Sequence, residues 1–185
     1  ATARDLERVM IFADAADIGT VSVLPGDVNA GQTRRQAMAA SAESLRALME
    51  VAEPFAARLC IEPHVHSWAE SPDLVRALVD ETGIRLALDY AHFACLGCRQ
   101  EEIDPLAPFA AHVHLRQARM GVLQSKFAQG TLNFPAMFGT LREAGYEGAL
   151  ALEPVHQDYM NTLFDDVLTE AIALRDCFRA YQETM

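Results

Sequence analysis

Four short apolar segments of this chain share one alternating pattern, and that pattern constrains the fold more than any other feature. In each segment, large apolar residues alternate with small or polar ones, and the second series ends in an acidic residue or a histidine. Successive side chains of a strand point to opposite faces, so each segment is predicted to be a strand with one apolar and one partly polar face. The segments are residues 57–63, 84–90, 110–116 and 148–154, and their terminal polar residues are Glu62, Asp89, His114 and Glu153.

Amphipathic helices are predicted between these strands. They cover residues 4–19, 33–52, 71–83, 134–145 and 161–183, and a further strand is predicted over 20–26. The best-marked helix has Ser71 as N-cap, Pro72 at its first position and Gly83 just past its end. Strands that alternate with helices predict a parallel sheet, here with five βα units. In a barrel the polar faces of such strands line the interior, and their last residues meet at the C-terminal mouth.

Length and charge narrow the class of protein. A chain of 185 residues is long enough for one domain with a real core, so residues 1–185 are interpreted as a single domain. The net charge of −11 argues against nucleic acid as a partner. We expect no membrane partner, because no apolar run is long enough for a membrane span. Four cysteines without a regular framework favour a reducing, cytoplasmic location.

Converging carboxylates require a counter-charge, because their mutual repulsion would otherwise raise their pKa values and destabilise the fold. A divalent cation supplies that charge. Two glutamates, one aspartate and one histidine form a mixed oxygen and nitrogen set that suits Mn²⁺, Mg²⁺, Co²⁺ or Zn²⁺. The alternative is a series of separate ion pairs with Arg58, Arg85 or Arg116.

The stretches "CIEPHVHS", "LALDYAHF", "AAHVHLRQA" and "GYEGALALEP" together resemble the xylose-isomerase-like TIM barrels, the sugar phosphate isomerase/epimerase family. In that family a Glu, an Asp, a His and a second Glu at successive strand ends bind one divalent metal ion. The resemblance therefore implies Glu62, Asp89, His114 and Glu153 as metal ligands. The family's D-x-x-H pairing is matched by Asp89 and His92, and its G-x-hydrophobic-x-F element by residues 130–134.

This resemblance implies a fold and an activity. The fold is a partial (β/α)8 TIM barrel whose five units correspond to strands 4–8, so the chain is expected to be N-terminally incomplete. A complementing N-terminal segment or a second copy of the chain is expected as a partner. The activity is isomerisation or epimerisation of a sugar or related polyol or keto-sugar, by proton transfer through a metal-stabilised enediolate. Glu62 and Glu153 would act as acid and base.

Three further residues are predicted to contact the substrate. His92 follows Asp89 in the next loop, Arg116 follows the His114 strand, and His64 lies just past Glu62. For Arg116, an ion pair with a carboxylate is the alternative. Two alternative enzyme classes remain open, a metal-dependent lyase or dehydratase and an endonuclease-IV-like hydrolase, and the negative charge counts against the second. A truncated barrel that serves only as an assembly partner is the non-catalytic alternative.

Overall fold

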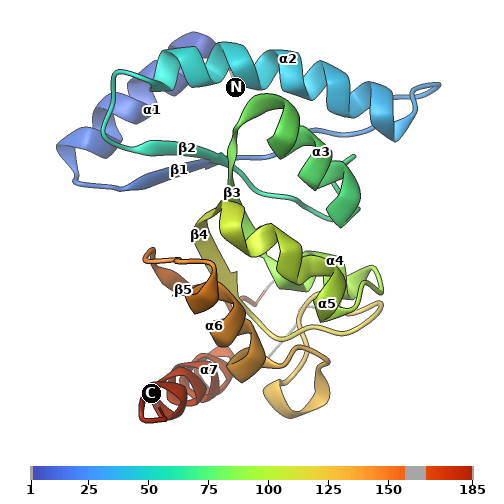
Figure 1. The fold of residues 1–185 in the computed structure, drawn as a ribbon, viewed down its shortest axis with the longest axis vertical. Coiled ribbons are helices and arrows are strands. Elements are labelled where there is room, and N and C mark those ends of the chain that lie inside the picture. Colours follow the sequence, from blue (N-terminus) through green and yellow to red (C-terminus); the bar gives the residue numbers. More distant parts are fainter. Residues whose placement is uncertain (1, 157–165, 185) are drawn as a thin grey trace. The chain divides into compact units, whose positions relative to one another are not determined.

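A computed structural model describes residues 2–156 and 166–184 of the chain (Figure 1). The described residues form an α/β fold with five parallel strands in the order β1-β2-β3-β4-β5, which confirms the predicted partial (β/α)8 barrel. The chain divides into two compact units, Ala1–Ala87 and Leu88–Met185. None of the helices in the described residues is long and apolar enough to cross a membrane.

The first unit contains three helices and the strands between them. Its elements are α1 (Ala3–Ala15), β1 (Thr20–Val23), α2 (Arg34–Ala52), β2 (Arg58–Ile61), α3 (Pro72–Thr82) and the start of β3 (Arg85–Asp89). Strand β1 pairs in parallel with β2 from Thr20↔Arg58 to Val23↔Ile61, and Cys60 of β2 pairs with Arg85 of β3. Helices α1 and α2 pack against each other and lie along β1 and β2 (Figure 1).

The local sequence explains where these helices begin and end. Thr2 with Asp5 and Thr33 with Gln36 form capping boxes that start α1 and α2. Helix α3 has Ser71 at its N-cap position and Pro72 at its first position, and it ends at Gly83, whose φ of 75° is left-handed. The predicted boundaries of this helix are therefore confirmed.

The second unit begins with Leu88 and Asp89, the last residues of β3. It continues with α4 (Tyr90–Cys95), α5 (Gln100–Ile103), the 3-10 helix η1 (Asp104–Phe109), β4 (Ala110–Leu115), the 3-10 helix η2 (Phe127–Gln129), α6 (Phe134–Glu143), β5 (Leu150–Leu152) and α7 (Val167–Gln182). Strand β4 pairs in parallel with β5, with His114 opposite Ala151. Helix α7 packs against α6 and β5.

Several predicted boundaries differ from the structure. The first helix ends at Ala15 rather than near Gly19, because Asp17 takes a left-handed φ of 54° and turns the chain. The strand predicted over 20–26 ends at Val23, two residues before Pro25. The short helices α4, α5 and η1 were not predicted, since six or fewer residues give no helical periodicity. The closing helix covers Val167–Gln182, and the start predicted for it at 161–165 lies outside the described residues.

Candidate metal centre

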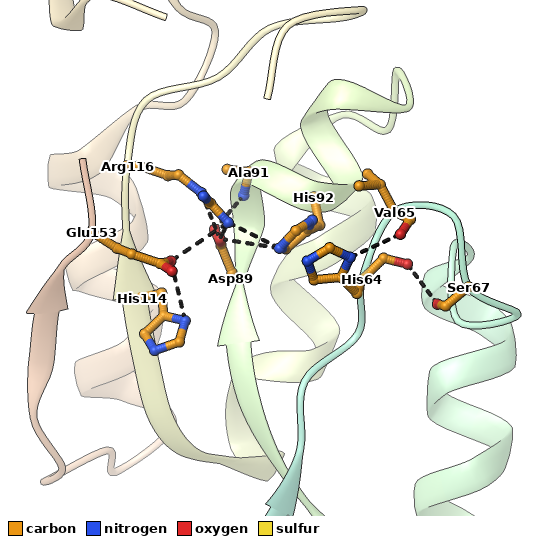
Figure 2. Close-up of polar contacts among 9 residues, drawn as sticks. All are labelled: His64, Val65, Ser67, Asp89, Ala91, His92, His114, Arg116 and Glu153. Carbon is orange, nitrogen blue, oxygen red and sulfur yellow. Dashed lines mark hydrogen bonds and ion pairs between the residues drawn. The ribbon is translucent and has the colours of Figure 1, made fainter. Parts of the chain in front are cut away.

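Three predicted ligands lie together at the strand ends of the second unit (Figure 2). Asp89 is the last residue of β3, His114 lies one residue before the end of β4, and Glu153 directly follows β5. The backbone N–H of Glu153 donates to the Leu115 carbonyl at 2.9 Å, which extends the β4–β5 pairing by one residue. One donor atom from each of Asp89, His114 and Glu153 lies within 4.8 Å of the others.

Each oxygen of the Asp89 carboxylate has a separate partner. Oδ1 accepts a hydrogen bond from the Ala91 amide at 2.8 Å and so caps α4. Oδ2 accepts hydrogen bonds from Nε and Nη2 of Arg116 at 2.9 and 2.6 Å. Asp89 is only 1% exposed. Burial is the largest single influence on the pKa of this carboxyl and would raise it, but the Arg116 guanidinium, His92 and the Ala91 amide together hold the pKa below its usual value.

Arg116 also connects Asp89 to two neighbouring side chains (Figure 2). Its Nη2 lies 2.9 Å from Nε2 of His92 and 3.5 Å from Oε2 of Glu153. A guanidinium has donors but no acceptor, so Nε2 of His92 must accept this hydrogen bond. Of the two interpretations of Arg116, the ion pair with a carboxylate is present in the structure.

His114 contacts both its strand neighbour and Glu153. The ring Nδ1 of His114 lies 3.3 Å from Oε2 of Glu153. The rings of His112 and His114 meet edge to face, with centroids 4.9 Å apart. This contact confirms that the two histidines share one face of β4, as the alternating pattern predicted.

Glu62 belongs to the first unit, where it directly follows β2. Its backbone N–H donates to the Val23 carbonyl at 3.0 Å, so it extends the β1–β2 pairing as Glu153 extends β4–β5. Burial, and secondarily the charge of Glu62, raises the pKa of the Cys60 thiol to about 12. That Cys60 and Glu62 share one face stays a prediction from the alternation of strand side chains.

The loop after Glu62 carries His64, and side-chain hydrogen bonds fix its shape. Nδ1 of His64 lies 2.8 Å from the Val65 carbonyl, and the Ser67 hydroxyl donates to the His64 carbonyl at 2.5 Å (Figure 2). Beyond it, His66 adopts a left-handed φ of 64°, and its amide donates to Glu70 at 2.8 Å. Such a backbone conformation is uncommon for a residue other than glycine, and here it is accompanied by the hydrogen bond from the His66 amide to Glu70.

The spacing of His114 and Glu153 suits two ligands of one divalent ion. Two ligand atoms that are each about 2.1 Å from one ion lie roughly 3.0–3.4 Å apart. The distance of 3.3 Å between His114 Nδ1 and Glu153 Oε2 falls in this range. Imidazole and carboxylate ligands suit Mg²⁺, Mn²⁺, Co²⁺ and Zn²⁺ alike, so the residues do not select among them.

Two buried glutamines support the loop that follows β4, and neither was predicted to have this role. The side chain of Gln117 exchanges hydrogen bonds with the backbone of Leu132, donating at 3.0 Å and accepting at 3.0 Å. Gln124 makes a similar pair of hydrogen bonds with Val155. Gly130, from the G-x-hydrophobic-x-F element, passes so close to Gln117 that a Cβ would lie 2.1 Å from its Cδ. The glycine is therefore required by packing.

Solved structures with this fold include enzymes and metal-bound proteins. An L-ribulose 3-epimerase matches with a TM-score of 0.77 and 19% identity, over 98% of this chain and 67% of its own. The IOLI protein with a bound zinc atom matches with a TM-score of 0.75 and 16% identity, over 96% of this chain and 69% of its own. A Mycobacterium smegmatis protein in complex with magnesium matches with a TM-score of 0.74 and 13% identity, over 97% of this chain and 67% of its own.

These similarities at low identity concern the fold, and the sequence itself settles the family. No curated protein matches the sequence significantly. The model of the family described as xylose isomerase-like TIM barrel matches residues 1–177. The chain therefore belongs to the xylose isomerase-like TIM barrel family.

Proposed function

We propose that this chain carries the metal centre of a divalent-metal-dependent isomerase or epimerase that acts on a sugar or related polyol. Membership of the family supports this proposal, as does an L-ribulose 3-epimerase among proteins of the same fold. The observation that carries it is the cluster of Asp89, His114 and Glu153 at adjoining strand ends.

In this proposal Glu62 completes the ligand set of Asp89, His114 and Glu153. The charges of these residues support a divalent ion. Three carboxylates and the Arg116 guanidinium leave two net negative charges, which one divalent cation neutralises. Mn²⁺, Mg²⁺, Co²⁺ and Zn²⁺ remain the candidates, and proteins of this fold contain zinc or magnesium.

Glu153 and Asp89 differ in solvent exposure, and this difference suggests which carboxylate exchanges a proton with the substrate and which only binds the metal. The Glu153 side chain is 32% exposed, whereas Asp89 is 1% exposed and both of its oxygens accept hydrogen bonds. Glu153 is therefore the more accessible of these two carboxylates, and we assign it as one acid–base group, with Glu62 as the other. When bound, the divalent ion supplies Lewis acidity that lowers the pKa of the C–H beside the substrate carbonyl.

We also propose substrate contacts for His64, His92 and Arg116. His64 is half-buried and lies in the hydrogen-bonded loop after Glu62. His92 and Arg116 are bonded to each other and almost fully buried, so any of their polar atoms that a substrate reaches are held in a fixed arrangement. A fixed arrangement favours one orientation of a polyol, because each hydroxyl must find its partner without rearrangement.

Metal binding and proton exchange test this proposal in two stages. Mn²⁺ is titrated into the metal-free protein and followed by electron paramagnetic resonance, and we expect one bound ion per chain. The loaded protein is then incubated in D₂O with ketopentoses and ketohexoses, and NMR detects deuterium beside the carbonyl. An epimer as product supports the proposal, whereas loss of water from the substrate identifies a lyase instead. A chain that binds no divalent ion and exchanges no proton would contradict the proposal.

A further inference from the structure

The side-chain amide of Gln124 holds the backbone just beyond Glu153. Its Nε2 donates to the Val155 carbonyl at 2.6 Å, and its Oε1 accepts from the Val155 amide at 2.7 Å. Gln124 is 1% exposed. A buried amide that satisfies both its donor and its acceptor on one residue fixes the position of that residue's backbone.

The loop that carries Gln124 is itself attached to the end of β4. The amide of the next residue, Ser125, donates to the Gln117 carbonyl at 2.7 Å. The Gln117 side chain in turn bonds to both backbone groups of Leu132. Gln124 therefore links the exit of β4, where His114 lies, to the exit of β5, where Glu153 lies.

Glu153 is consequently restrained on both sides along the chain. Its own amide donates to the Leu115 carbonyl at 2.9 Å, and Val155 is held by Gln124. Pro154 lies between the two and has a ring that fixes its φ. Few backbone torsions are left between these two anchors, so a displacement of Val155 is transmitted to Glu153.

We propose that Gln124 is a positioning residue for Glu153, because it holds the backbone from which the carboxylate reaches the metal and the substrate. This inference rests on the function proposed above. The side-chain amide supplies a donor and an acceptor together; a glutamate carboxylate lacks the donor, and a methionine of similar shape lacks the donor and offers only a weak acceptor.

A matched pair of variants tests the role of Gln124. Gln100 makes the same two-bond arrangement elsewhere in the second unit, donating to the Asn133 carbonyl at 3.2 Å and accepting from its amide at 2.8 Å. Gln124→Met and Gln100→Met each remove one such arrangement, but only the first lies beside Glu153. We expect Mn²⁺ affinity to fall about tenfold in Gln124→Met and to stay at the wild-type value in Gln100→Met.

Both variants are titrated at a temperature well below their measured unfolding midpoints, so a loss of folded protein does not mimic weak binding. Gln124→Ala, which removes the same bonds without adding a sulfur, replaces Gln124→Met if the latter does not fold. Mn²⁺ affinity at the wild-type value in a folded Gln124 variant would overturn the inference. An equal loss of Mn²⁺ affinity in Gln100→Met would overturn it too, because the loss would then not depend on the position of Gln124 beside Glu153.

Hydrogen exchange separates this inference from the proposed function. If the wild-type chain binds no Mn²⁺, the proposed function fails, and the amides of Glu153 and Val155 become the readout. Faster exchange at both amides in Gln124→Met but not in Gln100→Met supports the positioning role. Unchanged exchange at Glu153 would overturn it, because the anchor would then not restrain the residue it is proposed to orient.

Discussion

Arg116 donates two hydrogen bonds to a single oxygen of Asp89, from Nε at 2.9 Å and from Nη2 at 2.6 Å. The side chains of both residues are almost completely buried, at 4% and 1% exposure. The attraction between such charges is weakly screened, and each is costly to leave alone. The pair is therefore a structural requirement of the second unit as well as a neighbour of the proposed metal site.

Removal of Arg116 should strongly destabilise the protein. Arg116→Met leaves the Asp89 carboxylate buried without its cation, and we expect the free energy of unfolding to fall by about 3–5 kcal/mol. Urea denaturation at pH 7 measures this. The Arg116→Met, Asp89→Asn double variant should recover much of the loss, because it buries no unpaired charge.

A matched control uses an ion pair of similar length at the surface. Arg175 and Asp176 lie 2.8 Å apart and are both about half exposed. Arg175→Met should change the free energy of unfolding by less than about 1 kcal/mol. Equal effects of the two arginine substitutions would contradict the role given to the buried pair.

Replacement of Glu153 by glutamine should abolish turnover while the fold is retained. The amide cannot accept a proton from the substrate, and it is a weaker ligand than a carboxylate. We expect at least a 100-fold loss of kcat, of the order that general acid–base groups contribute. Thermal unfolding of the metal-free protein should be little changed, because this side chain is partly exposed.

Glu147→Gln is the control for charge alone, since Glu147 is exposed and lies before β5. That variant should retain wild-type turnover and Mn²⁺ affinity. Wild-type turnover in Glu153→Gln would remove Glu153 from the acid–base pair.

A side chain at position 130 should destabilise the loop after β4. The backbone of Gly130 has a φ of −93°, which any residue tolerates, so only crowding opposes Gly130→Ala. The added Cβ would meet Gln117, whose side chain is fixed by hydrogen bonds to Leu132. We expect a loss of about 1–3 kcal/mol in urea denaturation.

Gly139, in the middle of α6, provides the contrasting substitution. A Cβ there would meet only the Tyr181 hydroxyl, at an ordinary contact distance of 3.9 Å. Gly139→Ala should therefore stabilise the protein by about 0.8–1 kcal/mol through helix propensity. If Gly130→Ala leaves the free energy of unfolding unchanged, the Gln117 side chain can move aside without destabilising the protein, which would contradict the prediction for position 130.

The Cys60 thiol should be unreactive in the native protein. It is fully buried, and its pKa is raised to about 12, so almost none of it is thiolate at pH 8. Cys98 is partly exposed. After brief treatment with iodoacetamide, peptide mass spectrometry should find Cys98 modified and Cys60 intact.

The same treatment in 8 M urea should modify both cysteines. This control would show that mass spectrometry detects the modified peptide of each cysteine. Native labelling of Cys60 at the rate of Cys98 would mean that β2 opens easily. It would also mean that the face shared by Cys60 and Glu62 is open to solvent.

Strand periodicity predicted much of this architecture because burial imposes it directly. The alternation of His112 and His114 with apolar residues is determined by the two faces of β4, so the sequence carries it. The strand ends at Asp89 and Glu153 follow from the same argument. The short helix α4 was not predicted, because its formation depends on the Asp89 N-cap and on the burial of its residues in the folded chain.

Loop interactions of the site could not be predicted in this way. Gln117 and Gln124 are ordinary polar residues in the sequence, and their partners at Leu132 and Val155 are fifteen and thirty-one residues away. For Arg116, the sequence allowed both a substrate contact and an ion pair, because a guanidinium suits either. The choice depends on which carboxylate lies within reach, which only the folded chain determines.

The cap that Asp89 forms on α4 makes one backbone amide a built-in reporter. Ala91 N–H points at Oδ1 of the same carboxylate whose other oxygen accepts from Arg116. Anything that withdraws electron density from this carboxylate weakens the hydrogen bond and shifts the amide proton resonance of Ala91. A single peak in a nitrogen–proton spectrum can therefore follow events at Asp89 without a probe, a chromophore or a turnover assay.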